Sequence, residues 1–242
     1  MAVTFAATDD LLAFVEGIQG VAERGDGAAG YYMFRALDRC LTEFERRFGG
    51  GRRERPLDEV LADESVLRLF DEADLLRIHG QCQRLRESDP ARLGQKDDWL
   101  LKSAVAGYPR GQAEWALWLV NGGSSLPEGE ALEQAREFAR AALSSNDPAV
   151  FPAVSAVISG LSERDASRES SWFVAACQRG FDCGPGSEMT RIICRLDPNC
   201  QPDASSLDQL RRSAGRDFEA IERGAREINA AIDARQFDEL GL

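Results

Sequence analysis

The chain has 242 residues, of which 43% are hydrophobic and 29% are charged, and this composition is ordinary for a globular chain of one or two domains. Its 41 acidic and 29 basic residues give a net charge of −12, which disfavours nucleic acid as a partner because phosphate binding needs a concentrated basic face. No run of the sequence approaches the ~20 apolar residues of a membrane-spanning helix, so no integral membrane segment is predicted.

Residues 1–88 are predicted to form N-terminal helical hairpins. A helix is expected from about Ala28 to Phe48, where apolar residues recur at i, i+3 and i+4, and another from Asp71 to Leu85. Cys40 lies late in the first of these helices and Cys82 lies one turn before the end of the second. Cysteines on two neighbouring antiparallel helices can meet, so we predict a Cys40–Cys82 disulfide.

Residues 89–242 contain one motif twice. The stretch WLLKSAVAGYPRGQAEWALWL begins at Trp99, and WFVAACQRGFDC begins at Trp172. Both contain a Trp, two apolar residues, a small pair, a Gly and an aromatic residue. Gly107 and Gly180 are placed to end a helix in the left-handed conformation. Apolar residues after Tyr108 are spaced for one face of a second helix, which predicts a helix–turn–helix hairpin.

This hairpin resembles a Sel1-like repeat, one of the tetratricopeptide-like helical families. The resemblance is carried by Ala104-x-x-Gly107-Tyr108-x-x-x-Gln112-Ala113-x-x-Ala116-Leu117, and a weaker half-match is Ala22-x-x-Gly25-Asp26. The two motif tryptophans lie about two repeats apart, at ~34 to 40 residues per repeat. The resemblance implies a short α-solenoid of stacked antiparallel hairpins, a role in binding other proteins, and no catalytic residues.

Further helices are expected in the second half of the chain, and no segment has the alternation of a β-strand. Their expected ranges are Glu130–Leu143, Phe151–Leu161, Glu188–Arg195 and Leu207–Leu240, the last with a bend or break near Gly215. The predicted fold class is therefore all-α. Residues 89–242 are expected to hold Sel1-like repeats, a Cys-rich loop and a C-terminal helix, as a separate part or as one continuous solenoid with residues 1–88.

The six cysteines favour a disulfide framework over free thiols. The last four follow the pattern C-x5-C-x10-C-x5-C, which is not the C-x2-C pairing of zinc sites. Loop geometry favours Cys177–Cys183 and Cys194–Cys200, with Cys183–Cys194 and Cys177–Cys200 as the second choice.

Disulfides indicate a periplasmic or otherwise exported protein. The first residues lack the basic region and long apolar core of a signal peptide. Two interpretations remain open: an export signal has been removed, or the protein is cytoplasmic.

Nothing in the sequence supports a catalytic, metal or cofactor site. His79 is the only histidine, and a lone histidine in a leucine-rich helix is more often structural than catalytic. No phosphate-binding loop, nucleophile elbow or zinc-protease motif is present. The basic cluster of Arg46, Arg47, Arg52, Arg53 and Arg55 is interpreted as a solvated loop.

The favoured function is an interaction module that binds a protein or peptide. Trp115 and Trp118 are its candidate binding residues, although tryptophans at helical spacing are more often core, and the concave face of a solenoid is its expected surface. The first alternative is a carboxylate-dependent hydrolase, which would need two buried acidic side chains about 5 to 10 Å apart in a deep pocket. A dedicated inhibitor or regulator of one cognate protein is the second.

Overall fold

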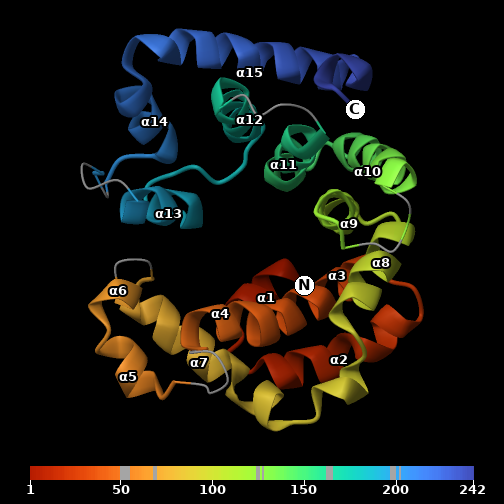
Figure 1. Ribbon diagram of the computed structural model, residues 1–242, viewed down its shortest axis with the longest axis vertical. Coiled ribbons are helices and arrows are strands. Elements are labelled where there is room, and N and C mark those ends of the chain that lie inside the picture. The colour runs from red at the N-terminus through yellow and green to blue at the C-terminus, as the bar shows by residue number, and fades with distance from the viewer. Residues whose placement is uncertain are drawn as a thin grey trace. The chain divides into compact units, whose positions relative to one another are not determined.

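The computed structural model describes residues 1–49, 55–67, 70–123, 126, 128–161, 166–196, 200–201 and 203–242. These residues are mainly helical and include no β-strand, which confirms the predicted all-α class. None of their helices combines the length and the apolar character that a membrane crossing requires. The chain divides into two units, Met1–Tyr108 and Pro109–Leu242. Figure 1 labels the helices of both units.

The first unit holds eight α-helices in the residues that the structure describes. They are α1 (Ala2–Ala7), α2 (Leu11–Glu23), α3 (Gly27–Leu37), α4 (Phe44–Phe48), α5 (Leu57–Leu61), α6 (Glu64–Leu67), α7 (Glu72–Glu87) and α8 (Lys96–Val105), joined by the π-helical turn η1 (Asp38–Glu43) and the 3-10 turn η2 (Pro90–Leu93).

Helix α3 is the centre of this unit, because almost every one of its side chains is buried. It begins at the cap Asp26, whose Oδ1 accepts a 2.8 Å hydrogen bond from the backbone N–H of Ala29. It packs against both α2 and α8. Gly30 allows the backbone of α8 to come close, since a Cβ at this position would lie 3.4 Å from the carbonyl oxygen of Trp99.

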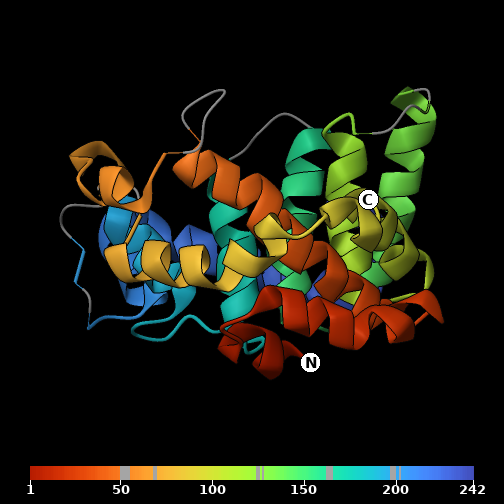
Figure 2. The same ribbon diagram turned by 90° about the horizontal axis from the view of Figure 1, so that it is seen from below.

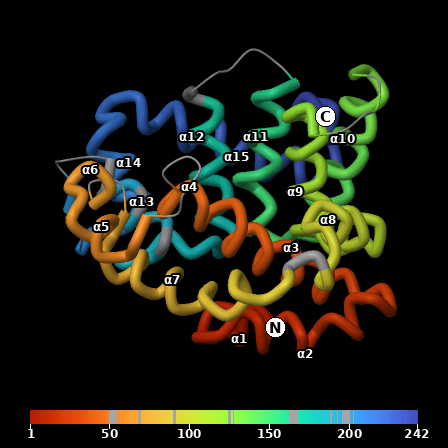
Figure 3. Tube along the Cα trace, turned by 60° about the horizontal axis from the view of Figure 1, so that its bottom comes forward, coloured from red at the N-terminus to blue at the C-terminus, as the bar shows by residue number. Residues whose placement is uncertain are grey.

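Helix α3 continues through η1 into α4, and Figure 3 follows this run. The π turn η1 carries Cys40, which pairs with Cys82 on α7 at a Cα–Cα distance of 5.1 Å, as predicted. Phe44 and Phe48 lie one and two turns further on, stacked with ring centroids 4.3 Å apart and fully buried. The same run therefore packs against α8 and α2 with its first half and against α7 with its second half.

Helix α8 belongs to the first unit, so the division between units follows Tyr108 and not residue 88, where the sequence suggested a boundary. The reason is its packing on α3. The Oγ of Ser103 donates a 2.7 Å hydrogen bond to the carbonyl oxygen of Gly27. Trp99 is 3% exposed, and its indole N–H donates to the carbonyl oxygen of Leu93 at 2.6 Å.

The second unit contains the remaining helices. They are α9 (Pro109–Val120), α10 (Glu128–Leu143), α11 (Phe151–Leu161), α12 (Ala166–Gln178), α13 (Glu188–Leu196), α14 (Ser206–Ala214) and α15 (Phe218–Asp233), with the 3-10 turns η3 (Pro148–Val150), η4 (Gly215–Asp217) and η5 (Phe237–Leu240).

Helices α9, α10 and α11 pack against one another, and Figure 2 shows them in green, side by side. The order then continues from α11 to α12 and from α12 to α15, while α14 contacts both α13 and α15. Arg179, near the end of α12, fastens this helix to α15: its guanidinium donates to the Oδ1 and the carbonyl oxygen of Asn229 and pairs with Asp233 at 2.5 Å.

The two copies of the sequence motif end their helices in the same way. Gly107 and Gly180 have φ of +79° and +96°, as predicted. Their N–H groups donate to the carbonyl oxygens three residues back, and the aromatic residues that follow donate five residues back. This is the Schellman pattern. Trp172, like Trp99, is buried. Because α8 and α9 fall in different units, the paired-hairpin arrangement stays a prediction.

Candidate functional site

The four cysteines of the second unit form two local disulfides. Cys177 pairs with Cys183 at a Cα–Cα distance of 5.8 Å, and Cys194 pairs with Cys200 at 4.9 Å. This is the first of the two pairings that the sequence left open, and none of the six cysteines is free. The turn 197–199, on which the second pairing was argued, lies outside the described residues.

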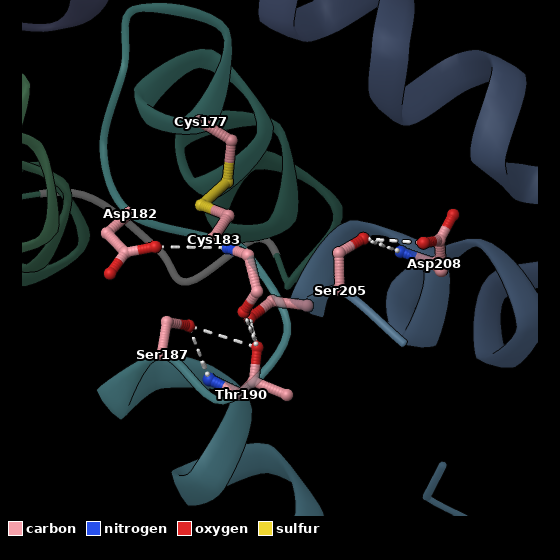
Figure 4. The surroundings of a disulfide bond; sticks show 9 residues. Cys177, Asp182, Cys183, Ser187, Thr190, Ser205 and Asp208 are labelled. Atoms are coloured by element: carbon pink, nitrogen blue, oxygen red, sulfur yellow. Dashed lines mark hydrogen bonds between the residues drawn. A yellow bond between two sulfur atoms is a disulfide. The ribbon is translucent and has the colours of Figure 1, made fainter. Parts of the chain in front are cut away.

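A buried cluster of hydroxyl groups lies beside Cys183 (Figure 4). The Oγ1 of Thr190 donates to the carbonyl oxygen of Gly184 at 2.8 Å, so it accepts from the hydroxyls of Ser187 and Ser206, at 3.0 and 2.6 Å. The N–H of Ser206 donates to the carbonyl oxygen of Cys183 at 2.9 Å.

The hydrogen bonds of this hydroxyl cluster favour a structural role. Within the described residues none of its three hydroxyls bonds to a histidine or a carboxylate, the usual groups that activate a serine or threonine nucleophile. The cluster instead fastens the starts of α13 and α14 to the loop closed by Cys177 and Cys183.

The sequence candidates Trp115 and Trp118 stack on each other on α9, with ring centroids 4.3 Å apart and an angle of 16° between the rings. Trp115 is buried and Trp118 half-buried. The backbone of Gly123 lies so close to the Trp118 indole that a Cβ there would collide with the ring. Contacts within the second unit therefore already cover much of the side-chain surface of Trp115 and Trp118. Their role in binding a partner stays a prediction.

His79 lies on α7 with its ring centroid 5.9 Å from that of Phe44 and 5.7 Å from that of Phe48. It lines a cavity of about 260 Å³ together with Phe44, Gln83, Arg86 and Glu87. Gln83 donates to Glu87 at 3.1 Å. Within the described ranges no three His, Cys, Asp or Glu side chains are grouped as metal ligands. These contacts favour the structural interpretation of His79.

The structure describes only part of the predicted basic cluster. Arg46 and Arg47 lie in the last turn of α4. Arg52 and Arg53 lie outside the described residues. Arg55 pairs with Asp63 at 3.0 Å, and Arg47 pairs with Glu43 at 3.5 Å. These two ion pairs neutralise part of the basic charge inside the first unit.

A groove of about 450 Å³ is open between α12, α15 and the turn η5. Its floor is made of small and apolar residues together with one buried serine. The floor residues are Ser171, Ala220, Gly224, Ile228, Ala231 and Leu240. Gly224 sets the closeness of the two helices, because a Cβ there would lie only 2.6 Å from the Oγ of Ser171.

Four exposed charged side chains line the rim of this groove: Arg168, Arg223, Glu227 and Glu239. Arg168 is held in place, because its Nη2 donates to the carbonyl oxygen of Leu240 at 3.0 Å. In the described part of the chain Arg223 and Glu227 form no ion pair, although they are one turn apart on α15. An arginine four residues before a glutamate is the weaker order for such a pair, which leaves both groups available.

Sequence reasoning did not find this groove. Ala220, Gly224 and Ala231 share one face of α15, and this row of small residues was the available signal that another helix comes close. The other wall could not be anticipated, because it comes from α12 and from η5, which are separated from that face in the chain.

Comparison of the chain with protein-family models, with curated proteins and with solved structures finds no match. The function is therefore argued from the residues of the groove.

Proposed function

We propose that the protein is an interaction module that binds a protein or peptide partner through the groove of its second unit. The observation that carries this proposal is a groove that combines small side chains with four exposed charged side chains, two of which, Arg223 and Glu227, form no ion pair among the described residues. Concave sites lined by apolar residues with a few polar groups at defined places are typical of ligand binding. The resemblance to Sel1-like repeats supports the same role.

The hydrolase alternative has less support. It requires two buried acidic side chains, and among the described residues no Asp or Glu is buried. Glu227 and Glu239 line the groove, but both are exposed. An exposed carboxylate lacks the closed pocket that a carboxylate-dependent hydrolase needs, whereas it is well suited to pairing with a cation on a partner.

An exported location, periplasmic or otherwise, is part of the proposal. All six cysteines are paired, and disulfides persist in oxidising compartments. A thiol titration of the unfolded, unreduced native protein tests this point. We expect no free thiol, and six free thiols would remove the support for export.

Site-specific photo-crosslinking in the native host tests the binding function. A photoreactive amino acid placed at Arg223 should capture a discrete partner. The same amino acid at Arg226, which is exposed on α15 and does not line the groove, should not. Equal capture from both positions, or none from either, contradicts the proposal. An assay of the captured partner's own activity then distinguishes an inhibitor from a scaffold.

A further inference from the structure

We propose that the groove of the second unit binds an extended polypeptide segment with one acidic and one basic side chain two positions apart. This inference rests on the proposed function and names the chemistry of the segment that the groove takes. It is carried by the length of the groove, its volume and the order of its charges.

The length follows from the helix that forms one wall. The lining residues of α15 run from Ala220 to Ala231. At 1.5 Å per residue this span is about 16 Å long. An extended chain advances about 3.3 Å per residue, so about five residues cover the same distance.

The volume favours an extended occupant over a helix. The groove holds about 450 Å³ along about 16 Å of α15. A helix with its side chains is about 10 Å across or more, so most of it would remain outside. An extended chain with small side chains facing the floor is narrower and fits.

The charges set the sequence of the segment. Arg223 and Glu227 are four residues apart on α15, a rise of about 6 Å. Side chains at alternate positions of an extended chain lie on the same face about 6.6 Å apart. An acidic residue opposite Arg223 thus places the residue two positions away opposite Glu227, where a basic side chain is favoured.

The opposite wall supports the same choice, because it also offers one charge of each sign. Arg168 is held by the carbonyl oxygens of Leu240 and Glu239, at 3.0 and 3.4 Å, and Glu239 supplies the carboxylate. A segment with two acidic side chains would face Glu227 and Glu239 as well as the arginines. A segment with two basic side chains would face both arginines. A uniformly charged segment would thus meet like charges on both walls, whereas a mixed segment can pair with both signs.

The test uses the full oxidised chain and four fluorescent pentapeptides built on alanine with blocked ends. Positions two and four carry aspartate and lysine, two aspartates, two lysines or two serines. Fluorescence anisotropy at low salt should show tightest binding of the mixed peptide. The peptides with two aspartates or two lysines should each bind about fivefold more weakly, the size expected for loss of one exposed ion pair, and the serine peptide, which loses both pairs, should bind more weakly still.

Charge reversals on α15 provide the specificity control. Arg223→Glu should transfer the preference to the peptide with two lysines, and Glu227→Arg to the peptide with two aspartates. Arg226→Glu makes the same charge change on the same helix outside the groove, so it should leave the order of affinities unchanged. All three positions are exposed, so the variants are expected to fold, and circular dichroism checks this.

The inference is overturned if the mixed peptide does not bind up to millimolar concentration, or if all four peptides bind equally. Equal effects of Arg223→Glu and Arg226→Glu would also overturn it. If the peptides fail while a photoreactive group at position 223 still captures a partner, the proposed function stands and only the extended mixed-charge segment is wrong.

Discussion

The side-chain hydroxyl of Ser103 donates a hydrogen bond to the carbonyl oxygen of Gly27, and this 2.7 Å contact joins the last turn of α8 to the first residue of α3. The glycine is required at this point. A Cβ on Gly27 would lie 2.9 Å from the Cβ of Tyr108 and 3.0 Å from the Cβ of Ala106. The end of α8 thus packs on α3 at a distance that leaves no room for a side chain.

Substitution of this glycine should destabilise the protein. Gly27→Ala is expected to lower the free energy of unfolding by about 1 to 3 kcal/mol, because the added methyl group is overpacked. Gly80→Ala is the matched control: Gly80 is within α7 with nothing within 4 Å of its Cβ position, and alanine is expected to stabilise by about 0.5 to 1 kcal/mol. Urea denaturation measures both, and equal effects contradict this packing.

The three disulfides should contribute unequally. Cys40 and Cys82 are 42 residues apart, whereas the other two pairs each span 6 residues. In the chain-entropy model the long loop contributes about 4 kcal/mol and a short loop about 2 kcal/mol. The double substitution Cys40→Ala/Cys82→Ala should therefore lower stability more than Cys194→Ala/Cys200→Ala. Thermal and denaturant unfolding of the two variants would show the order, and the reverse order would contradict it.

Substitution of Gly180 should destabilise the protein, because its positive φ is unfavourable for residues other than glycine. Its Cβ position is open, with nothing within 4 Å, so the effect of Gly180→Ala is conformational and not steric contact with neighbours. We expect a loss of about 1 kcal/mol, and a smaller loss for Gly180→Asn, which tolerates the left-handed region better. Gly129→Ala, in α10 with an equally open position and no positive φ, should be neutral or stabilising. If all three variants have the same stability, this assignment is wrong.

The pKa of Asp208, at the start of α14, should depend on the helix cap Ser205. The Ser205 hydroxyl donates to Asp208 at 2.6 Å, and this hydrogen bond is the main reason that the pKa of Asp208 is below its ordinary value (Figure 4). Ser205→Ala should raise the Asp208 pKa more than Arg211→Gln does, since the Arg211 charge is a smaller cause. A carbon-13 NMR titration of the side-chain carboxyl measures both shifts.

The sign of the pH effect follows from the lowered pKa. The stability that the Asp208 carboxylate contributes is fully present above the pKa of the unfolded chain. It is lost as the pH falls through the lower pKa of the folded state. A Ser205→Ala variant whose Asp208 pKa equals that of the parent protein would contradict this role of the cap.

The helices and disulfides were predictable because their signals are local. Gly107 and Gly180 end helices through contacts within a few residues of chain. The pairing of Cys177 with Cys183 follows from a short loop in the same way. The Cys40–Cys82 pair, by contrast, needed the additional assumption that two helices are neighbours, and α7 does lie against η1.

The π turn and the groove were not predictable. Residues 38–43 have no composition that distinguishes a π turn from an α-helix; the packing of Cys40 on Cys82 accompanies it. The groove depends on which helix lies over the small residues of α15. Periodicity identifies such a face but not its partner, so Trp115 and Trp118 were chosen by residue type alone.

The π turn η1 carries Cys40 in the run from α3 to α4. The number of residues before Cys40 in this run therefore decides whether the Cys40–Cys82 disulfide can form. Each residue turns an α-helix by about 100°, so deletion of one residue of α3 between Phe34 and Leu37, before the π turn, would rotate everything after it by that angle. Cys40, Phe44 and Phe48 would then point away from α7 together, and Cys82 would lose its bonding partner. The rotation of this helical run at Cys40 thus decides whether the Cys40–Cys82 disulfide can form.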